Sequence, residues 1–311
     1  MNGEQAVREA ERRTADLKVL ARALPLFGDD AVDAAGPIPR LFSASHVARE
    51  TFGVAQLETS LNGGLLRYPY IGLVRDGKQV SPREFTQTRR VAFAEQSLYA
   101  DAGLVVKQFH EGSTIILKSL EEWHPPVRDM INELAALTGT QVKADVFFTP
   151  PHAKALVVHR DEFHIFAVQL HGTKDWVLQG VPEGDSWRGG PAPADTLDNP
   201  ENVTLTSGDV MFLEAGTAHS AKSQDTSSMH IAFEFRSFRI TDRLDQVIRE
   251  IAAAEGAGFV SLDTDVAARQ IRSTLSRISE ETAKLDTSTL AREAAQKLIA
   301  DSTRHGVTFG R

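Results

Sequence analysis

A series of short apolar segments between residues 142 and 235 constrains the fold of this chain most strongly. Gly, Pro, Asp and Ser residues separate the segments, and β-branched or aromatic residues dominate within them. Short strands at this spacing are typical of an antiparallel sandwich or barrel. The segments are Val146–Phe148, Ala155–Val158, Ile165–Leu170, Trp176–Leu178, Val203–Leu205, Val210–Leu213 and Ile231–Phe235.

Helical patterns flank this β-rich part of the chain. Residues 4–24 have amphipathic helical spacing, and Pro125-Pro126 opens a second helix that ends at Gly139. After Arg239 three more helical stripes follow. One of them alternates steps of four and three, which is a short heptad-like seam. Its residues are Ile271, Leu275, Ile278, Thr282 and Leu285.

Smaller elements are predicted ahead of the barrel. Residues 65–74 have the composition of a strand, and Asp76-Gly77 is a hairpin turn signal. Ser81-Pro82 predicts the start of a helix. We therefore predict a mainly β protein with helical additions. A mixed α/β region of residues 1–140 supports a barrel of residues 141–238, and a helical module covers residues 239–311.

Composition excludes several kinds of site. The chain has 311 residues and no cysteine, so disulfides, thiolate metal sites and cysteine nucleophiles are ruled out. The net charge of −8 provides no basic face, so nucleic acid is not an expected partner. Residues 1–22 lack an apolar signal core, and no apolar run reaches membrane-spanning length. We expect a cytoplasmic protein with no membrane association.

A His-x-Asp pair in the β-rich part is the first candidate for chemistry. His159 and Asp161 are two residues apart, so on an extended segment both side chains point to one face. His219 closes a later run that begins at Ser207. Two histidines and one carboxylate that leave other positions open are the ligand set of non-haem Fe(II) oxygenases. The alternative for His159 is a histidine at a strand end that is hydrogen-bonded to a neighbour.

The surroundings of this pair resemble one protein family. The pattern His-x-Asp, Phe-x-x-Gln-x-x-Gly-x-Lys-x-Trp and Gly-Asp…Gly-x-x-His, with a Thr-Pro-Pro lead-in, resembles the JmjC/cupin-like 2-oxoglutarate oxygenases, specifically the bacterial relatives of ribosomal-protein hydroxylases. The resemblance implies a double-stranded β-helix, or jelly-roll, barrel with iron at its open end. The matching residues are Thr149, Pro150, Pro151, His159, Asp161, Phe166, Gln169, Gly172, Lys174, Trp176, Gly208, Asp209, Gly216 and His219.

The resemblance also implies roles for individual residues. His159, Asp161 and His219 would form the facial triad of Fe(II), which leaves positions for 2-oxoglutarate and O₂. Lys174 would bind the distal carboxylate of 2-oxoglutarate, and Thr149 is a second candidate for the same carboxylate. The alternative for Lys174 is a surface lysine whose stem lies along a strand.

Some positions depart from the family pattern. Asp145 stands where asparagine is expected, and His164 stands where aspartate is common. His164 has the opposite parity to His159 on an extended strand, so we interpret it as a supporting or core residue. The Pro/Gly-rich segment 182–200 is interpreted as a loop over the barrel mouth.

The function that follows is an Fe(II)/2-oxoglutarate-dependent dioxygenase that hydroxylates a C–H bond of a protein, peptide or amino-acid-derived substrate. Two alternatives stay open: a non-catalytic cupin-like binding or scaffold module, and a hydroxylase of a specialised metabolite. The helical stripes after Arg239 are too short to build a core of their own. We therefore expect them to pack on the barrel or on a second copy, and we favour a homodimer.

Overall fold

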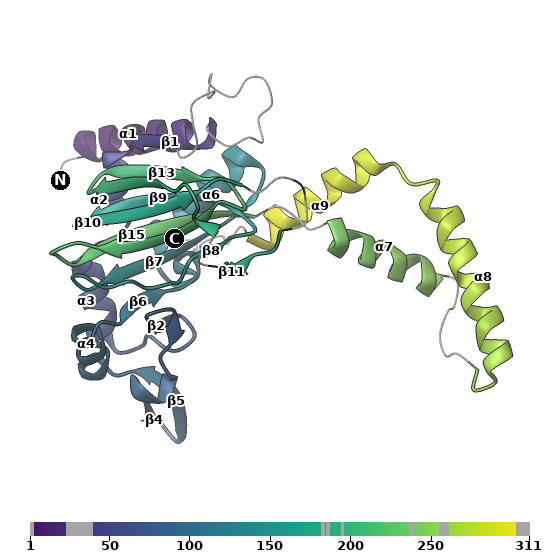
Figure 1. Ribbon diagram of the computed structural model, residues 1–311, viewed down its shortest axis with the longest axis horizontal. Coiled ribbons are helices and arrows are strands. Elements are labelled where there is room, and N and C mark those ends of the chain that lie inside the picture. The colour runs from purple at the N-terminus through teal and green to yellow at the C-terminus, as the bar shows by residue number, and fades with distance from the viewer. Residues whose placement is uncertain are drawn as a thin grey trace. The chain divides into compact units, whose positions relative to one another are not determined.

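The structure is a computed structural model, and it describes residues 3–22, 40–181, 184, 187–193, 196–236, 240–254 and 261–302. The chain divides into two compact units, one formed by residues up to 236 and one by residues 237–303. The first unit contains the β-rich part of the chain (Figure 1). The second unit is helical.

Two antiparallel sheets form the barrel. The strands of the large sheet are β1 (Arg40–Ser43), β2 (Ile71–Arg75), β3 (Lys78–Gln79), β6 (Thr114–Leu117), β7 (Gln141–Thr149), β9 (His164–His171), β13 (Asp209–Leu213) and β15 (Ser228–Arg236). Their order is β1-β13-β9-β15-β7-β6-β2-β3. The strands of the small sheet are β8 (His159–Arg160), β10 (Thr173–Gln179), β11 (Gly190–Pro191), β12 (Glu201–Thr206) and β14 (Ala218–Ser223). Their order is β11-β8-β14-β10-β12. The predicted mainly β fold with helical additions is confirmed.

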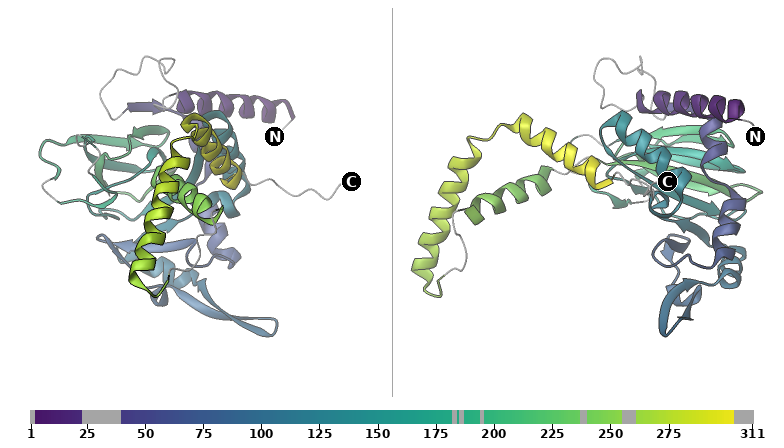
Figure 2. Two further views of the ribbon diagram at one scale, coloured as in Figure 1. Left: turned by 90° about the vertical axis from the view of Figure 1, so that its right-hand side faces the viewer. Right: turned by 180° about the vertical axis from the view of Figure 1, so that it is seen from behind.

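Helices cover the outer face of the large sheet. The helices of the first unit are α1 (Gly3–Arg22), α2 (Ser45–Thr51), α3 (Val54–Gly63), α4 (Ala102–His110), α5 (Leu120–Trp123) and α6 (Pro125–Thr138). Helix α2 contacts β9, while α5 and α6 contact β7. Seen from behind, α6 lies across the sheet (Figure 2). Pro125 begins α6 and Gly139, with φ of +64°, ends it, as the sequence predicts.

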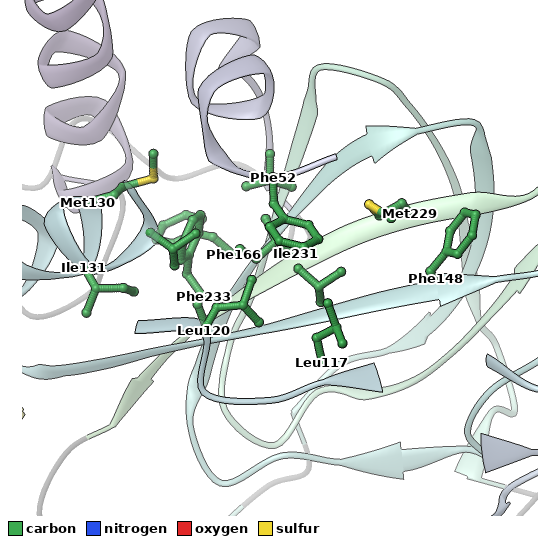
Figure 3. Packing of buried hydrophobic residues seen from close by; sticks show 14 of the residues in the cluster. Phe52, Leu117, Leu120, Met130, Ile131, Phe148, Phe166, Met229, Ile231 and Phe233 are labelled. Carbon is green, nitrogen blue, oxygen red and sulfur yellow. The ribbon is translucent and has the colours of Figure 1, made fainter. Parts of the chain in front are cut away.

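The central strands are buried on both faces because their residues alternate between two cores. On β15, Ile231, Phe233 and Phe235 face the helices, whereas Ala232 faces the inside of the barrel. The outer core joins Ile231 and Phe233 to Met130 of α6 and to Phe52, which directly follows α2 (Figure 3). The inner core includes Ile165, Ala167, Trp176, Leu178, Val203, Leu205, Met211, Leu213 and Ala232. The large sheet therefore lies between a helical layer and the barrel interior.

Local predictions ahead of the barrel are borne out unevenly. The hairpin turn at Asp76-Gly77 joins β2 to β3, but β2 begins only at Ile71. Ser81 caps a single 3₁₀ turn, Pro82–Glu84, instead of a longer helix. A hairpin of β4 (Thr86–Val91) and β5 (Ala94–Ala100) follows directly. Residues 86–91 pair as a strand with β5, so the turn that Ser81 caps does not extend into a helix.

The second unit consists of α7 (Ile240–Ala254), α8 (Thr264–Thr282) and α9 (Thr287–Ser302). Within the described part of this unit α8 has no buried residue. Ile271 and Leu275, which belong to the predicted seam, are 51% and 60% exposed. The apolar stripe of α8 therefore remains uncovered. None of the helices in the described ranges has the length and apolar character needed to cross a membrane.

Gly172 between β9 and β10 provides a test of this packing. Its φ is +64°, and a Cβ atom there would lie 2.1 Å from the carbonyl oxygen of Ser227. Gly139 has the same φ, but a Cβ would meet nothing within 4 Å. We expect Gly139→Ala to cost about 1 kcal/mol of unfolding free energy from backbone strain alone. Gly172→Ala should cost about 2–5 kcal/mol because the overlap adds to the strain. Equal losses in urea unfolding would contradict the close approach.

Candidate active site

Three side chains from two distant parts of the sequence meet at one end of the small sheet. His159 on β8 pairs directly with His219 on β14, and Asp161 follows β8. The Asp161 Oδ2 atom lies 3.6 Å from His159 Nε2 and 3.5 Å from His219 Nε2. One ligand atom from each residue lies within 4.8 Å of the others. Two imidazoles and a carboxylate at this separation can bind one metal ion on one face.

Hydrogen bonds to the backbone orient both imidazole rings. The Nδ1 atom of His159 lies 3.0 Å from the carbonyl oxygen of Val157. The Nδ1 atom of His219 lies 3.0 Å from the carbonyl oxygen of Thr217. A carbonyl only accepts, so each Nδ1 carries a proton, and Nε2 is the ring nitrogen that can bind a metal. Burial also lowers the pKa of His219 to about 4, with a further decrease from His159. The Nε2 atoms therefore point toward Asp161 in the form that binds a metal.

A glycine turn sets the position of His219 relative to Asp161. The amide of Gly216 donates a hydrogen bond of 2.8 Å to the carbonyl oxygen of Asp161. The Arg160 guanidinium donates to the carbonyl oxygen of Gly216. Gly216 has a φ of +90°, and a Cβ there would meet the Trp187 ring at 2.9 Å. Only glycine fits this turn, which ties the two halves of the triad together.

His164 supports the same turn and is not one of the three clustered residues. Its Nδ1 accepts a hydrogen bond of 3.2 Å from the amide of Ala215. Its ring stacks on Phe212 with a centroid separation of 5.8 Å. Burial lowers its pKa, so the neutral ring that accepts this bond is favoured. These contacts agree with the interpretation of His164 as a supporting residue.

Lys174 is buried inside the barrel beside the triad. Its side chain is 1% exposed, and its Nζ donates a hydrogen bond of 3.0 Å to Thr149 Oγ1. The Nδ1 atom of His230 lies 3.1 Å from the same Nζ. The structure thus brings together Lys174 and Thr149, the two residues proposed for one carboxylate. The surface alternative for Lys174 is wrong, because the side chain points into the interior.

The charge of Lys174 is unmatched. Within the described residues no carboxylate forms an ion pair with it, and burial lowers its pKa to about 7. Burial and the Lys174 charge lower the pKa of His230, so the imidazole remains neutral and accepts from the ammonium. A buried cation with only neutral partners is unfavourable unless an anion binds. Lys174 is therefore a buried cation that could be neutralised by a negatively charged ligand.

The triad and Lys174 line one cavity with mostly apolar walls. Its volume is about 710 Å³, including solvent at its opening. Glu234 on β15 also lines it, and burial raises the pKa of Glu234 to about 7. The remaining walls are Phe147, Ala155, Leu156, Phe163, Ile165, Trp176, Leu213, Ala221, His230 and Ala232. Such a cavity can hold a small organic anion close to a metal ion.

His230 and Glu234 were not identified as site residues from the sequence. A signal is present in Ser228–Arg236, where polar residues alternate with Ile231, Phe233 and Phe235. That alternation places His230, Ala232 and Glu234 on the face opposite the apolar residues. The sequence does not tell which face is the barrel interior, because both faces of β15 are covered.

The segment 182–200 is attached to the site through β11. Gly190 pairs with Arg160, and Pro191 pairs with His159. The amide of Ala192 adds a hydrogen bond of 2.9 Å to the carbonyl oxygen of Val158. Residues 182–183, 185–186 and 194–195 of the predicted loop lie outside the described residues. The described part of this segment therefore lies beside the backbone of His159.

Because the Lys174 ammonium is buried, we expect the free energy of unfolding to change with pH above about 7. Its pKa is 10.5 in an ordinary setting and about 7 in the fold. Between these values the unfolded chain binds more protons, so the free energy of unfolding rises with pH. We expect the free energy of unfolding of wild type to rise, relative to that of Lys174→Met, by up to about 1.4 kcal/mol per pH unit from pH 7 to 10. Urea unfolding measures it, and Lys78→Met on exposed β3 is the control. A difference that stays flat with pH would contradict the buried charge.

The chain matches known proteins in its barrel region. The family model described as JmjC domain matches residues 121–242. The bifunctional lysine-specific demethylase and histidyl-hydroxylase NO66 of Drosophila simulans is 28% identical over 129 residues. The match covers 40% of this chain and 15% of that protein. NO66 of Dictyostelium discoideum is 28% identical over 137 residues, which cover 41% of this chain and 26% of that protein. The chain thus corresponds to a small part of these relatives.

A solved structure shares the fold. The ycfD protein of E. coli is similar with a TM-score of 0.53 and 13% sequence identity. The similarity covers 88% of this chain and 70% of that one. At this identity the likeness concerns the fold. Together with the antiparallel barrel, it shows that residues 121–242, which match the JmjC domain model, have a cupin-like fold.

Proposed function

We propose that this chain is an Fe(II)- and 2-oxoglutarate-dependent oxygenase that hydroxylates a C–H bond of a protein, peptide or amino-acid-derived substrate. One observation carries the proposal. A cluster with the composition of a facial triad lies in the same apolar cavity as a buried lysine that has no carboxylate partner in the described residues. The donor set fits iron, and the lysine fits a dianionic co-substrate.

Each residue has a distinct task in this proposal. His159, Asp161 and His219 would hold Fe(II) through two Nε2 atoms and one carboxylate oxygen. Lys174 and Thr149 would bind the distal carboxylate of 2-oxoglutarate, the ammonium through a charge-assisted hydrogen bond. When bound, Fe(II) and 2-oxoglutarate supply from O₂ the oxidant that places one oxygen atom on the substrate carbon, with succinate and CO₂ as co-products. Three protein ligands leave positions for 2-oxoglutarate and O₂.

The protein also shields the reaction from water. Trp176 lies with its ring 5.9 Å from the His219 ring and 5.2 Å from the His230 ring. Phe147 stacks on His230 at 4.9 Å. These aromatic side chains would keep the space between the metal ligands and Lys174 apolar, which strengthens the charge interactions there.

A protein substrate is favoured by the relatives. The NO66 proteins carry the activities of a lysine-specific demethylase and a histidyl-hydroxylase in their names. Both activities modify amino-acid side chains. A small specialised metabolite is the second class of substrate, and the cytoplasmic location remains a prediction.

The proposal is tested by succinate formation from 2-oxoglutarate with Fe(II), with and without candidate peptides. His159→Ala and His219→Ala should each lower the rate at least about 100-fold, because a metal centre is sensitive even to changes outside its ligands. His152→Ala is the control, since this histidine is exposed and away from the cluster. Wild-type rates in either ligand variant would contradict the triad. A wild-type protein that binds Fe(II) and 2-oxoglutarate without producing succinate would instead be a binding module.

The helical module of residues 239–311 is proposed to form a homodimer. The support is the uncovered apolar stripe of α8, with Ile271 and Leu275 exposed in the described part of the unit. An exposed stripe of this kind is stabilised when a second helix covers it. Light scattering at micromolar concentration should give the mass of two chains. The mass of one chain would contradict the proposal.

A further inference from the structure

One charged residue of the active-site cavity has no role in the proposed function. Asp161 belongs to the metal ligands, and Lys174 with His230 belongs to the anion site. Glu234 lines the same cavity and is 9% exposed. Burying a carboxylate in an apolar cavity costs free energy unless a charged or hydrogen-bonding partner compensates for it.

The hydrogen bonds of Glu234 leave one of its oxygens free. The Nε and Nη2 atoms of Arg236 both donate to Oε2, at 3.1 and 2.5 Å. In the described part of the chain no donor reaches Oε1. The Arg236 guanidinium in turn lies over the Phe163 ring at 4.4 Å, so it is held to one side. The second oxygen remains available to a ligand in the cavity.

The position of Glu234 along β15 separates it from the anion site. His230, Ala232 and Glu234 share the cavity face of this strand. Four residues of strand correspond to about 13 Å. His230 contacts Lys174 at one end of this row, and Glu234 stands at the other end. The small side chain of Ala232 lies between them. The cavity therefore has a cationic end and an anionic end, and the distal carboxylate of the proposed co-substrate fits only the cationic end.

The surroundings of Glu234 favour a positive partner over a neutral one. Burial and the charges of Asp145 and Asp161 all raise its pKa, and only Arg236 lowers it. Asp145 lines a second hollow that shares Phe147 and Leu156 with the active-site cavity. Lys118 lines that hollow beside Asp145, whereas Glu234 and Asp161 are the carboxylates on the active-site side. A cationic group at Oε1 would relieve the repulsion between these carboxylates.

We propose that Glu234 determines substrate specificity by binding a positively charged side chain of the substrate through its free Oε1 atom. The proposal rests on the proposed oxygenase function, because that function assigns the other end of the cavity to 2-oxoglutarate. The ligand class is a guanidinium or ammonium group on a peptide or an amino-acid-derived molecule. Charge-assisted hydrogen bonds of this kind discriminate strongly against neutral analogues.

The test uses saturation-transfer NMR on the full chain without metal. The probes are the N-acetyl amides of arginine, lysine, glutamine and leucine. For wild type we expect Kd values about tenfold lower for arginine and lysine than for glutamine and leucine. Glu234→Gln should remove this preference. Glu111→Gln is the matched control, because Glu111 also pairs with an arginine, Arg75, at 3.1 Å but lies outside the cavity. It should keep the preference.

A further variant separates binding from a structural role of the ion pair. Arg236→Gln breaks the same pair but retains the carboxylate, so the preference for cationic probes should persist. Equal binding of all four probes to wild type, or no binding of the cationic ones, would overturn the proposal. A preference that survives in Glu234→Gln, or disappears equally in Arg236→Gln, would overturn it too. The measurement needs neither metal nor turnover, so its failure is distinct from failure of the oxygenase activity.

Discussion

The burial of β15 on both faces is the constraint on which the rest of this structure depends. Its outward residues, Ile231, Phe233 and Phe235, join the core beneath the helices. Its inward residues, His230, Ala232 and Glu234, line the cavity. A change of register by one residue would exchange these two sets and place polar groups in the core. Pairing with β7 and β9 along the whole strand prevents such a shift.

The same arrangement explains the electrostatics of the cavity. Strands that are covered on both sides exclude water. Each polar group inside is therefore unfavourable unless a side chain, a backbone group or a ligand forms a hydrogen bond or ion pair with it. The triad histidines are held by backbone carbonyls and leave Nε2 atoms near Asp161. Lys174 has only the neutral Thr149 and His230 as partners. The unfavourable burial of these groups is consistent with a cavity that is completed by a metal and an anion.

Sequence patterns identify the parts of this fold that depend on local spacing. Alternating apolar segments predict the antiparallel barrel, and Pro125 and Gly139 delimit α6. The clustering of His159, Asp161 and His219 is also predicted, from the His-x-Asp pair and from the resemblance of the surrounding motifs to an oxygenase family. His230 and Glu234 are not predicted as site residues, because their exposure to the cavity depends on which face of β15 the helices cover. The β4–β5 hairpin was missed for a similar reason, since the capping signal at Ser81 is local and the strand that follows pairs with a later segment.

We propose that Lys174 binds the distal carboxylate of 2-oxoglutarate beside a metal bound by the triad. Isothermal titration of 2-oxoglutarate into Mn(II)-loaded protein tests it most directly, because Mn(II) avoids turnover. Loss of a charge-assisted hydrogen bond in a buried site costs about 1.5–3 kcal/mol. Lys174→Ala should therefore raise Kd about 10- to 150-fold with Mn(II) binding unchanged, whereas Lys78→Ala on exposed β3 should leave it as in wild type. An unchanged Kd in Lys174→Ala would contradict the account.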